Sequence, residues 1–293
     1  MLGATSAGRA TADSARGLMI TLLGEFVLPL GGSAWTQTLL EAMDLVGVQP
    51  KTSRQVLARL ADGGWLDRTK AGRRTRWHLT ESASTLLDNG ASRIYGFGHD
   101  RPEWNGRWLV LLASLPERDQ HQRYRMTTGL TWAGFGSLGH GVWVCPWTDQ
   151  ESAAVGVLEE LDIEGATTFV AEVGALGDGS DLARRAWDLD ELCDAYVDFL
   201  ASTPDSQAGA AERPDESIAG ASAVADLTLL VHQWRRFPFL DPELPAALLP
   251  GAWPGHRAIE QFSTRRASLV HRARRWWTTT DEHLGPVPHA ATA

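Results

Sequence analysis

The chain has 293 residues, of which 43% are hydrophobic and 22% are charged, and its formal net charge is −9. This length suits two or three domains, and the composition is that of an ordinary globular protein. No apolar run approaches the length of a membrane span, residues 1–13 lack the apolar core of a signal peptide, and two cysteines are too few for a disulfide framework, so we expect a cytoplasmic protein without membrane partners.

Two helices, each with one apolar face, are predicted after a disordered tail. Hydrophobic residues recur at helical spacing within residues 14–30, and residues 35–46 repeat the pattern up to Gly47, where the helix is expected to end. The repeating positions are Leu18, Met19, Leu22, Leu23 and Phe26, then Leu39, Leu40, Met43 and Val46.

The next segment predicts a helix whose outward face is small, polar and basic. Thr52 opens it, and Gln55 can complete a capping box three residues later. The Gly63-Gly64 pair ends it. The buried face is expected to hold Ser53, Val56, Leu57 and Leu60, and the outward side Lys51, Arg54, Gln55, Ala58 and Arg59.

A basic hairpin is predicted next, with strands at residues 65–68 and 75–79 and Gly72 in the turn. Residues 51–76 contain eight Lys and Arg against two Asp, a net charge of +6 inside a chain of −9, so the remainder carries −15. One basic island on an acidic protein indicates a site for a polyanion.

Three helices followed by a basic hairpin are the order of a winged helix-turn-helix domain. In this arrangement one helix reads bases in the major groove, and the hairpin neutralises backbone phosphates. The alternative is an ordinary helical domain with a solvated charged face. We predict DNA contacts from Lys51, Thr52, Ser53, Arg54, Gln55, Arg59, Arg68, Lys70, Arg73, Arg74 and Arg76.

The periodicity changes after residue 104, and the middle of the chain predicts a ferredoxin-like α/β domain. Strands are expected at residues 107–114, 135–138, 141–145 and 166–173, with helices at 116–132 and 149–161. Beyond residue 181 only helices are expected, at 182–201, 218–237 and 255–278, interrupted by a loop at 203–217 and a proline-rich stretch at 238–250.

The predicted fold class is therefore α+β. We divide the chain into a disordered tail (1–13), a winged helix-turn-helix domain (14–90), a ferredoxin-like central domain (91–175), a helical C-terminal domain (176–282) and a second tail (283–293).

Several patterns that could support catalysis or cofactor binding have simpler interpretations. Gly134 to Gly139 matches the dinucleotide motif G-x-G-x-x-G, but a helix precedes it and a strand follows, the reverse of the required order. Cys145 is expected in a buried strand, and the acidic run at 159–164 on a solvated face. We predict no catalytic residues, metal or cofactor. Arginines between residues 265 and 275 could pair internally or with a second subunit, grip DNA, or bind a phosphorylated effector.

Four segments together resemble the PaaX-type regulators of phenylacetic acid degradation along nearly the whole chain. They are residues 52–60 with Gly64-Trp-Leu66 and Gly72-Arg-Arg74, Trp104-Asn-Gly-Arg-Trp108, residues 134–143, and Asp241-Pro-Glu-Leu-Pro245 through Pro250 with Trp253-Pro-Gly255. The central segment is also similar to small CRISPR-associated nucleases. Those need an Asp at the end of the first strand, where this chain has Ala113-Ser114-Leu115.

The resemblance implies a cytoplasmic homodimer that binds operator DNA, represses a catabolic operon and is released by an aryl-acyl-CoA such as phenylacetyl-CoA. Arg54, Gln55 and Arg59 would face bases, and Arg73 and Arg74 would hold backbone. Effector contacts are predicted at Arg107, Trp108, Trp132 and Arg236, because an anionic CoA attracts arginine and an aryl group attracts tryptophan. Packing between domains is the alternative role for these four. The alternative function is an acyl-CoA-acting enzyme with a winged-helix interaction module.

Overall fold

The computed structural model describes residues 15–98, 102–113, 120–203 and 216–285. The chain forms two compact units, one built from residues 1–97, 203–235 and 260–293, the other from 98–202 and 236–259. Each unit contains one antiparallel sheet with helices, so the prediction of an α+β fold is confirmed. No helix among the described residues is both long enough and apolar enough to cross a membrane.

The first unit begins with a continuous helical segment. Residues 15–22 are α-helical, and a π-helix at Leu23–Val27 (η1) and a 3-10 turn at Leu28–Leu30 (η2) follow. Met19, Leu22, Leu23 and Phe26 are fully buried, which confirms the predicted apolar stripe.

The first unit also contains a three-stranded sheet of order β1-β3-β2 and two helices. The sheet consists of β1 (Ser33–Trp35), β2 (Leu66–Ala71) and β3 (Arg74–Leu79), and the helices are α2 (Thr36–Leu45) and α3 (Pro50–Asp62). Gly47, with φ of 80°, reverses the chain after α2, as predicted. The predicted capping box is wrong, because α3 begins two residues earlier with Pro50 in its first turn and Gln49 as its cap, which places Thr52 inside the helix.

The hairpin of β2 and β3 has an unbroken register. Leu66 pairs with Leu79 at its base and Ala71 with Arg74 at its tip, so Gly72 and Arg73 form a two-residue turn. Gly72 has φ of 60°, and a glycine at the first position of such a turn is typical of type II′. The predicted glycine-containing turn is confirmed.

Three longer helices pack on this unit: α4 (Glu81–Gly96), α9 (Glu216–Trp234) and the part of α11 (Gly255–Glu282) from residue 260 onward. The Thr80 hydroxyl accepts a hydrogen bond from the Ala83 N–H and caps α4. Aromatic stacking fixes α11, with ring centroids 4.8 Å apart between Phe26 and Trp277 and 4.5 Å apart between Trp234 and Phe262.

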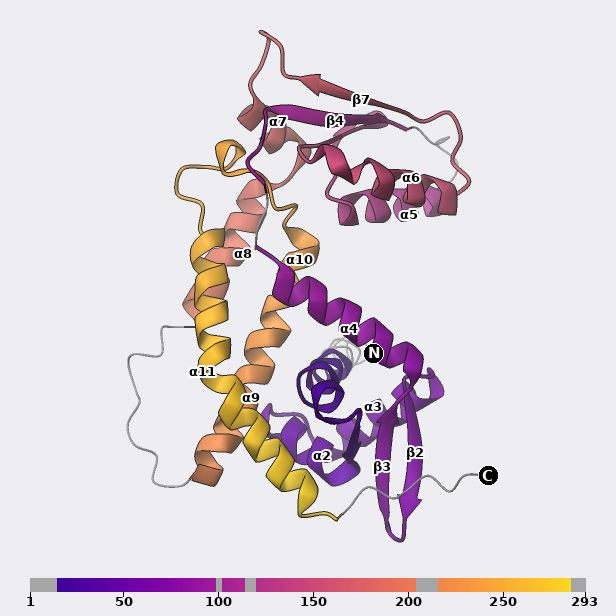
Figure 1. Ribbon diagram of the computed structural model, residues 1–293, viewed down its shortest axis with the longest axis vertical. Helices are drawn as coiled ribbons and strands as arrows, with labels where there is room; N and C mark the ends of the chain where they lie inside the picture. Colours follow the sequence, from indigo (N-terminus) through magenta and orange to yellow (C-terminus); the bar gives the residue numbers. More distant parts are fainter. Residues whose placement is uncertain (1–14, 99–101, 114–119, 204–215, 286–293) are drawn as a thin grey trace, which may run out of the picture. The chain divides into compact units, whose positions relative to one another are not determined.

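The second unit contains a four-stranded antiparallel sheet of order β5-β6-β4-β7. Its strands are β4 (Arg107–Leu112), β5 (Gly136–Gly139), β6 (Val142–Cys145) and β7 (Thr167–Glu172), all near the predicted positions. The helices α5 (Gln120–Trp132) and α6 (Glu151–Glu160), the latter preceded by the 3-10 turn η3 (Thr148–Gln150), cover one face of this sheet (Figure 1). The predicted start of α5 at 116 lies outside the described residues.

The opposite face of the sheet packs against helices from later in the sequence. These are α7 (Gly179–Ala186), the start of α8 (Leu189–Ser202) and the 3-10 turn η4 (Ala246–Leu248). The short α10 (Phe237–Leu240) packs on α8, with the ring centroids of Phe237 and Tyr196 4.3 Å apart. The prediction of one helix over 182–201 is wrong. Trp187 breaks it and packs against Trp108 with ring centroids 6.3 Å apart, and the Asp188 carboxylate caps α8 by accepting a hydrogen bond from the Glu191 N–H.

Candidate nucleic-acid interface

The outward face of α3 carries the longest row of exposed polar side chains near the hairpin. Lys51, Arg54, Gln55 and Arg59 are exposed, whereas Val56, Leu57 and Leu60 are buried in the first unit. The residues alternate in this way because apolar positions three and four apart place one side of the helix in the core. The other side is left to water or to a ligand.

Two residues of α3 lie differently from the rest of the predicted contact set. Ser53 is fully buried and its hydroxyl donates to the Gln49 carbonyl, so the prediction that it contacts DNA is wrong. Its position on the apolar face of the helix accounts for this. Thr52 is half-buried.

The hairpin adds a second group of cations. Arg68 and Lys70 are exposed on β2, and Arg73 and Arg74 are exposed at the tip. Arg74 pairs only with β2, because β1 ends at the level of Arg76. The tip therefore extends beyond the sheet, where its guanidinium groups are accessible.

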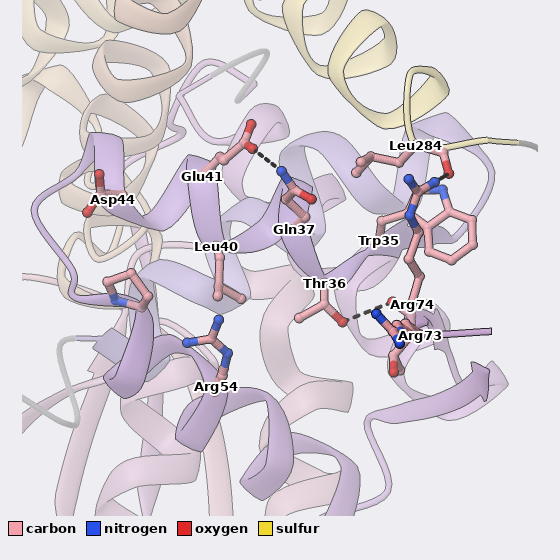
Figure 2. Close-up of a pocket in the computed structure, with 12 residues that line it drawn as sticks. Trp35, Thr36, Gln37, Leu40, Glu41, Asp44, Arg54, Arg73, Arg74 and Leu284 are labelled. Carbon is pink, nitrogen blue, oxygen red and sulfur yellow. Dashed lines mark hydrogen bonds between the residues drawn. The ribbon is translucent and has the colours of Figure 1, made fainter. Parts of the chain in front are cut away.

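A pocket of about 490 Å³ lies between these two groups of cations (Figure 2). Arg54 enters it from α3, Arg73 and Arg74 enter it from the hairpin, and Thr36 and Gln37 line it from the first turn of α2. The arginines come from segments about twenty residues apart in sequence and face a common concave surface. Such a surface suits an anion, because the helix N-terminus and all three guanidinium groups are positive.

Acidic residues border the same pocket. Glu41 and Asp44 line it from α2, and Glu41 accepts a hydrogen bond from the Gln37 amide at 2.9 Å. Figure 2 shows both carboxylates on the opposite side of the pocket from the hairpin arginines. A bound polyanion would be attracted at one side and repelled at the other, which orients it.

Arg76 was also predicted to contact DNA, and this prediction is wrong. Its side chain is buried, with its Nη1 atom 3.0 Å from Asp281 Oδ2 and its Nε donating to the Ser33 hydroxyl at 3.0 Å. The guanidinium also lies over the Trp35 ring, 5.2 Å from the centroid. Arg76 is on the central strand of the sheet, so the core encloses it.

The end of α11 belongs to this part of the molecule, which the sequence did not reveal. Asp281 Oδ1 accepts hydrogen bonds from the Trp35 N–H at 2.9 Å and the Thr38 hydroxyl at 2.8 Å, in addition to the ion pair with Arg76. The Leu284 carbonyl accepts a hydrogen bond from Arg74, and the Gly285 carbonyl accepts one from the Trp35 ring. The helix predicted to end at 278 thus reaches Glu282, and residues 284 and 285 of the predicted tail contact Arg74 and Trp35 of the first unit. The rest of that tail beyond residue 285 lies outside the described residues.

The four predicted effector residues have different environments in the second unit. Arg107 is exposed on β4, whereas its neighbour Trp108 is 1% exposed and lies in the core between the sheet and α7. Trp132 is 55% exposed beside Phe239, with ring centroids 5.2 Å apart, and the Arg236 guanidinium lies over the Phe237 ring. The burial of Trp108 fits the alternative role of packing.

The patterns that could suggest catalysis are structural. Cys145 is fully buried in β6, as predicted, and the glycine motif begins in the turn after α5 and continues through β5. In the part of the chain that the structure describes, no group of three His, Cys, Asp or Glu could hold a metal ion.

Two arginines of the predicted cluster on α11 form ion pairs within the chain. Arg266 lies 3.3 Å from Glu25, a buried residue of the π-helix, and Arg275 pairs with Glu216. Burial raises the pKa of Glu25, while Arg266 and Arg274 act in the opposite direction. Internal pairing, the first of the predicted roles, is therefore found at these two positions.

Three family models match consecutive parts of the chain. They are described as PaaX-like protein (residues 14–83), PaaX protein central Cas2-like domain (101–183) and PaaX-like protein C-terminal domain (187–279). Together they span most of the sequence in the order expected of one protein.

Two individual proteins are similar over most of their lengths. The transcriptional repressor PaaX of Escherichia coli is 31% identical over 250 residues, which are 84% of this chain and 77% of that protein. The structure of the uncharacterized protein Rv0674 from Mycobacterium tuberculosis aligns with a TM-score of 0.57 at 20% identity, covering 92% of this chain and 97% of that one, and shows a shared fold. Because three PaaX family models match consecutive parts of the sequence and the identity to the Escherichia coli repressor is 31%, the chain belongs to the PaaX family.

Proposed function

We propose that this protein is a DNA-binding transcriptional repressor that reads its operator through a winged helix-turn-helix domain. The observation that carries the proposal is the shared concave surface on which Arg54 of α3 meets Arg73 and Arg74 of the hairpin. In this arrangement α3 enters the major groove and the hairpin follows the backbone. The repressor role of the Escherichia coli relative and the family membership support it.

Within this proposal the contacts divide into two chemical kinds. Arg54, Gln55 and Arg59 present bidentate groups from the exposed face of α3 and would read base edges. The hairpin cations would hold phosphates, which positions the protein without reading sequence. The contact set is Lys51, Thr52, Arg54, Gln55, Arg59, Arg68, Lys70, Arg73 and Arg74.

We further infer that the central sheet with α5 and α6 is a ferredoxin-like domain and that the helices after it form a C-terminal domain. The succession strand, helix, two strands, helix, strand, with order β5-β6-β4-β7, supports the first part. In this scheme the protein is a homodimer, and an aryl-acyl-CoA such as phenylacetyl-CoA releases it from DNA by favouring a dimer whose reading heads no longer fit the operator. Arg107, Trp132 and Arg236 are the proposed effector contacts, because their side chains have accessible surface.

The test is a fluorescence anisotropy titration of the DNA that flanks the protein's own gene, with and without phenylacetyl-CoA. We expect tight, salt-sensitive binding that the thioester reverses. Tight binding that phenylacetyl-CoA does not change would support the repressor role and exclude phenylacetyl-CoA as the effector. Equal affinity for the flanking DNA and for random DNA of the same length would contradict the proposal.

A further inference from the structure

A cluster of cations lies in the first unit, away from the pocket described above. The helix at residues 15–22 and the end of α9 approach each other so closely at Gly17 that a Cβ atom there would lie 2.7 Å from Arg235 Nη2 and 2.9 Å from His232 Cε1. Only a glycine leaves the Arg235 guanidinium and the His232 ring room against the helix backbone. The Thr21 hydroxyl, which donates to the Gly17 carbonyl, lies 3.3 Å from His232 Nδ1 and fixes the ring.

Arg16, which precedes Gly17 in the same helix, carries a second guanidinium. It is exposed and lies over the Trp65 ring, 5.8 Å from the centroid. Burial lowers the pKa of Arg235, and the charge of Arg16 lowers it further. Burial, followed by the charge of Arg235, also lowers the pKa of His232.

This cluster has an excess of positive charge. Among the residues that the structure describes, no carboxylate forms an ion pair with Arg16 or Arg235, whereas on α11 Arg266 and Arg275 are both paired. Holding two guanidinium groups together, one of them half-buried, costs free energy unless an anion lies between them.

The cluster is separate from the pocket that contains Arg54, Arg73 and Arg74. Trp65 immediately precedes the base of the hairpin, where Leu66 pairs with Leu79, and Arg73 and Arg74 are at its tip. The six residue pairs of the hairpin span five steps of about 3.3 Å, so its two ends are roughly 17 Å apart. The pocket that contains Arg54, Arg73 and Arg74 is not lined by Arg16, His232 or Arg235.

We propose that Arg16, His232 and Arg235 form a binding site for the phosphate group of a small-molecule phosphate monoester. Such a group carries about −1.5 to −2 charges at neutral pH, which matches two guanidinium groups, whereas a carboxylate would neutralise only one. The planar fork of Arg235 can hold two of its oxygens, and His232 supplies a polar wall. This site is independent of the identity of the effector, although a CoA thioester carries a group of this kind.

The test is isothermal titration of the full-length protein with inorganic phosphate and, separately, with coenzyme A, at constant ionic strength. Wild-type protein should bind each probe saturably at one site outside the pocket that contains Arg54, Arg73 and Arg74. Arg235→Gln and Arg16→Gln should each weaken binding by about tenfold or more, because each removes a charged hydrogen-bond donor. Arg185→Gln, which removes the same charge from an exposed position of α7, is the matched control and should bind like wild type.

Two further variants identify the source of any signal. Arg73→Ala with Arg74→Ala should leave phosphate binding intact; loss of binding there, with retention in Arg235→Gln, would place the phosphate on the DNA surface and overturn the proposal. Arg235→Lys, which keeps the charge without the fork, should bind with intermediate affinity, and its melting temperature reports on folding. Phosphate binding that depends on Arg235, without any release of DNA by acyl-CoA, would uphold the site and remove only the proposed effector. Coenzyme A binding that is the same in Arg235→Gln and in wild type would overturn the proposed phosphate site and leave the proposed effector standing.

Discussion

Arg74 and Arg76 lie on the same face of β3, two residues apart, yet they have opposite environments. Arg74 is at the tip, beyond the end of β1, and its guanidinium is exposed. Arg76 is paired on both sides in the sheet and is 5% exposed. The net charge of the segment suggests that both arginines bind phosphate, but only the Arg74 side chain lies outside the core.

The buried ion pair of Arg76 and Asp281 leads to a stability prediction. Asp281→Ala should lower the free energy of unfolding by about 3–5 kcal/mol, because it leaves a buried guanidinium unpaired. It also removes the acceptor of the Trp35 N–H and the Thr38 hydroxyl. Denaturant unfolding measures the change.

The neighbouring Glu282→Ala is the control for Asp281→Ala, since Glu282 is exposed in the same helical turn, and it should be nearly neutral. Replacing both partners of the pair, as Arg76→Met with Asp281→Leu, should recover most of the loss. If the double variant were as unstable as Asp281→Ala, the unpaired charge would not be the cause.

Arg54 is exposed on α3 and lines the pocket, and it is the residue that we propose reads a base. Arg54→Ala should weaken binding to the operator by about 1–3 kcal/mol and relax the preference at one base position, because a bidentate contact to a base edge is lost. Anisotropy titrations against operators varied one position at a time measure both effects, with Arg185→Ala, at an exposed position of α7, as the control. An equal loss of affinity on operator and random DNA would show that Arg54 contacts phosphate instead.

At the scale of elements, the proposal gives the hairpin the role of contributing charge and not of reading sequence. Arg73→Ala with Arg74→Ala should reduce the slope of log affinity against log salt concentration by about two, near 0.9 for each lost phosphate contact. Base preference should not change. Titrations between about 50 and 200 mM salt give the slope, and an unchanged slope would exclude the hairpin from the interface.

Helix α3 and the hairpin of β2 and β3 could be predicted because the sequence signals for them are local. The apolar positions of α3 and the turn at Gly72 follow from neighbouring residues, and both were found as expected. The break at Trp187 was missed, because helical periodicity continues across it and only the packing of Trp187 against Trp108 reveals the interruption. Pro50 is a local signal for the start of α3, because proline is common in the first turn of a helix. The prediction instead began the helix at Thr52, where Thr52 and Gln55 match a capping box.

The candidate site was less predictable, because its decisive contacts are long-range. Asp281 is more than 200 residues from Trp35 and Arg76, and nothing in the spacing of either segment indicates the pairing. Ser53 could have been excluded by its helical periodicity alone, which places it with Val56 and Leu57 on the buried face.

The proline-rich segment after α10 contains a buried carboxyl that makes stability depend on pH. Asp241 accepts hydrogen bonds from the Tyr196 hydroxyl and the Glu243 N–H, both at 2.6 Å, and burial raises its pKa. The folded state therefore keeps this proton at pH values where the unfolded chain has lost it, so the contribution of Asp241 to stability falls as pH rises from about 4 through the raised pKa.

The neutral variant Asp241→Asn isolates this effect. The melting temperature of wild type relative to the variant should decline as pH rises from about 4 to 7, because the variant has no proton to lose. Thermal melts of both proteins in matched buffers give this difference. A constant or increasing difference would mean that Asp241 is not protonated in the folded state.

For the whole molecule, the distribution of charge matters more than its sum. The segment from 51 to 76 carries +6 while the chain carries −9, so most of the surface repels DNA. Repulsion elsewhere restricts encounter to the face that contains α3 and the hairpin, and such steering acts on association rates and falls with ionic strength.

A dimeric repressor would bind two half-sites with a fixed rotational relation, and this gives the last prediction. Inserting five base pairs between the half-sites turns one of them by about half a helical turn and should reduce affinity at least about tenfold. Inserting ten base pairs returns both half-sites to the same side of the duplex and should recover part of the lost affinity. Anisotropy on the three operators measures the effect, and light scattering gives the mass of the free protein against the 31.9 kDa chain. Equal affinity for all three operators would mean that each reading head binds alone, because rigidly coupled heads cannot follow a half-site to the opposite side of the duplex.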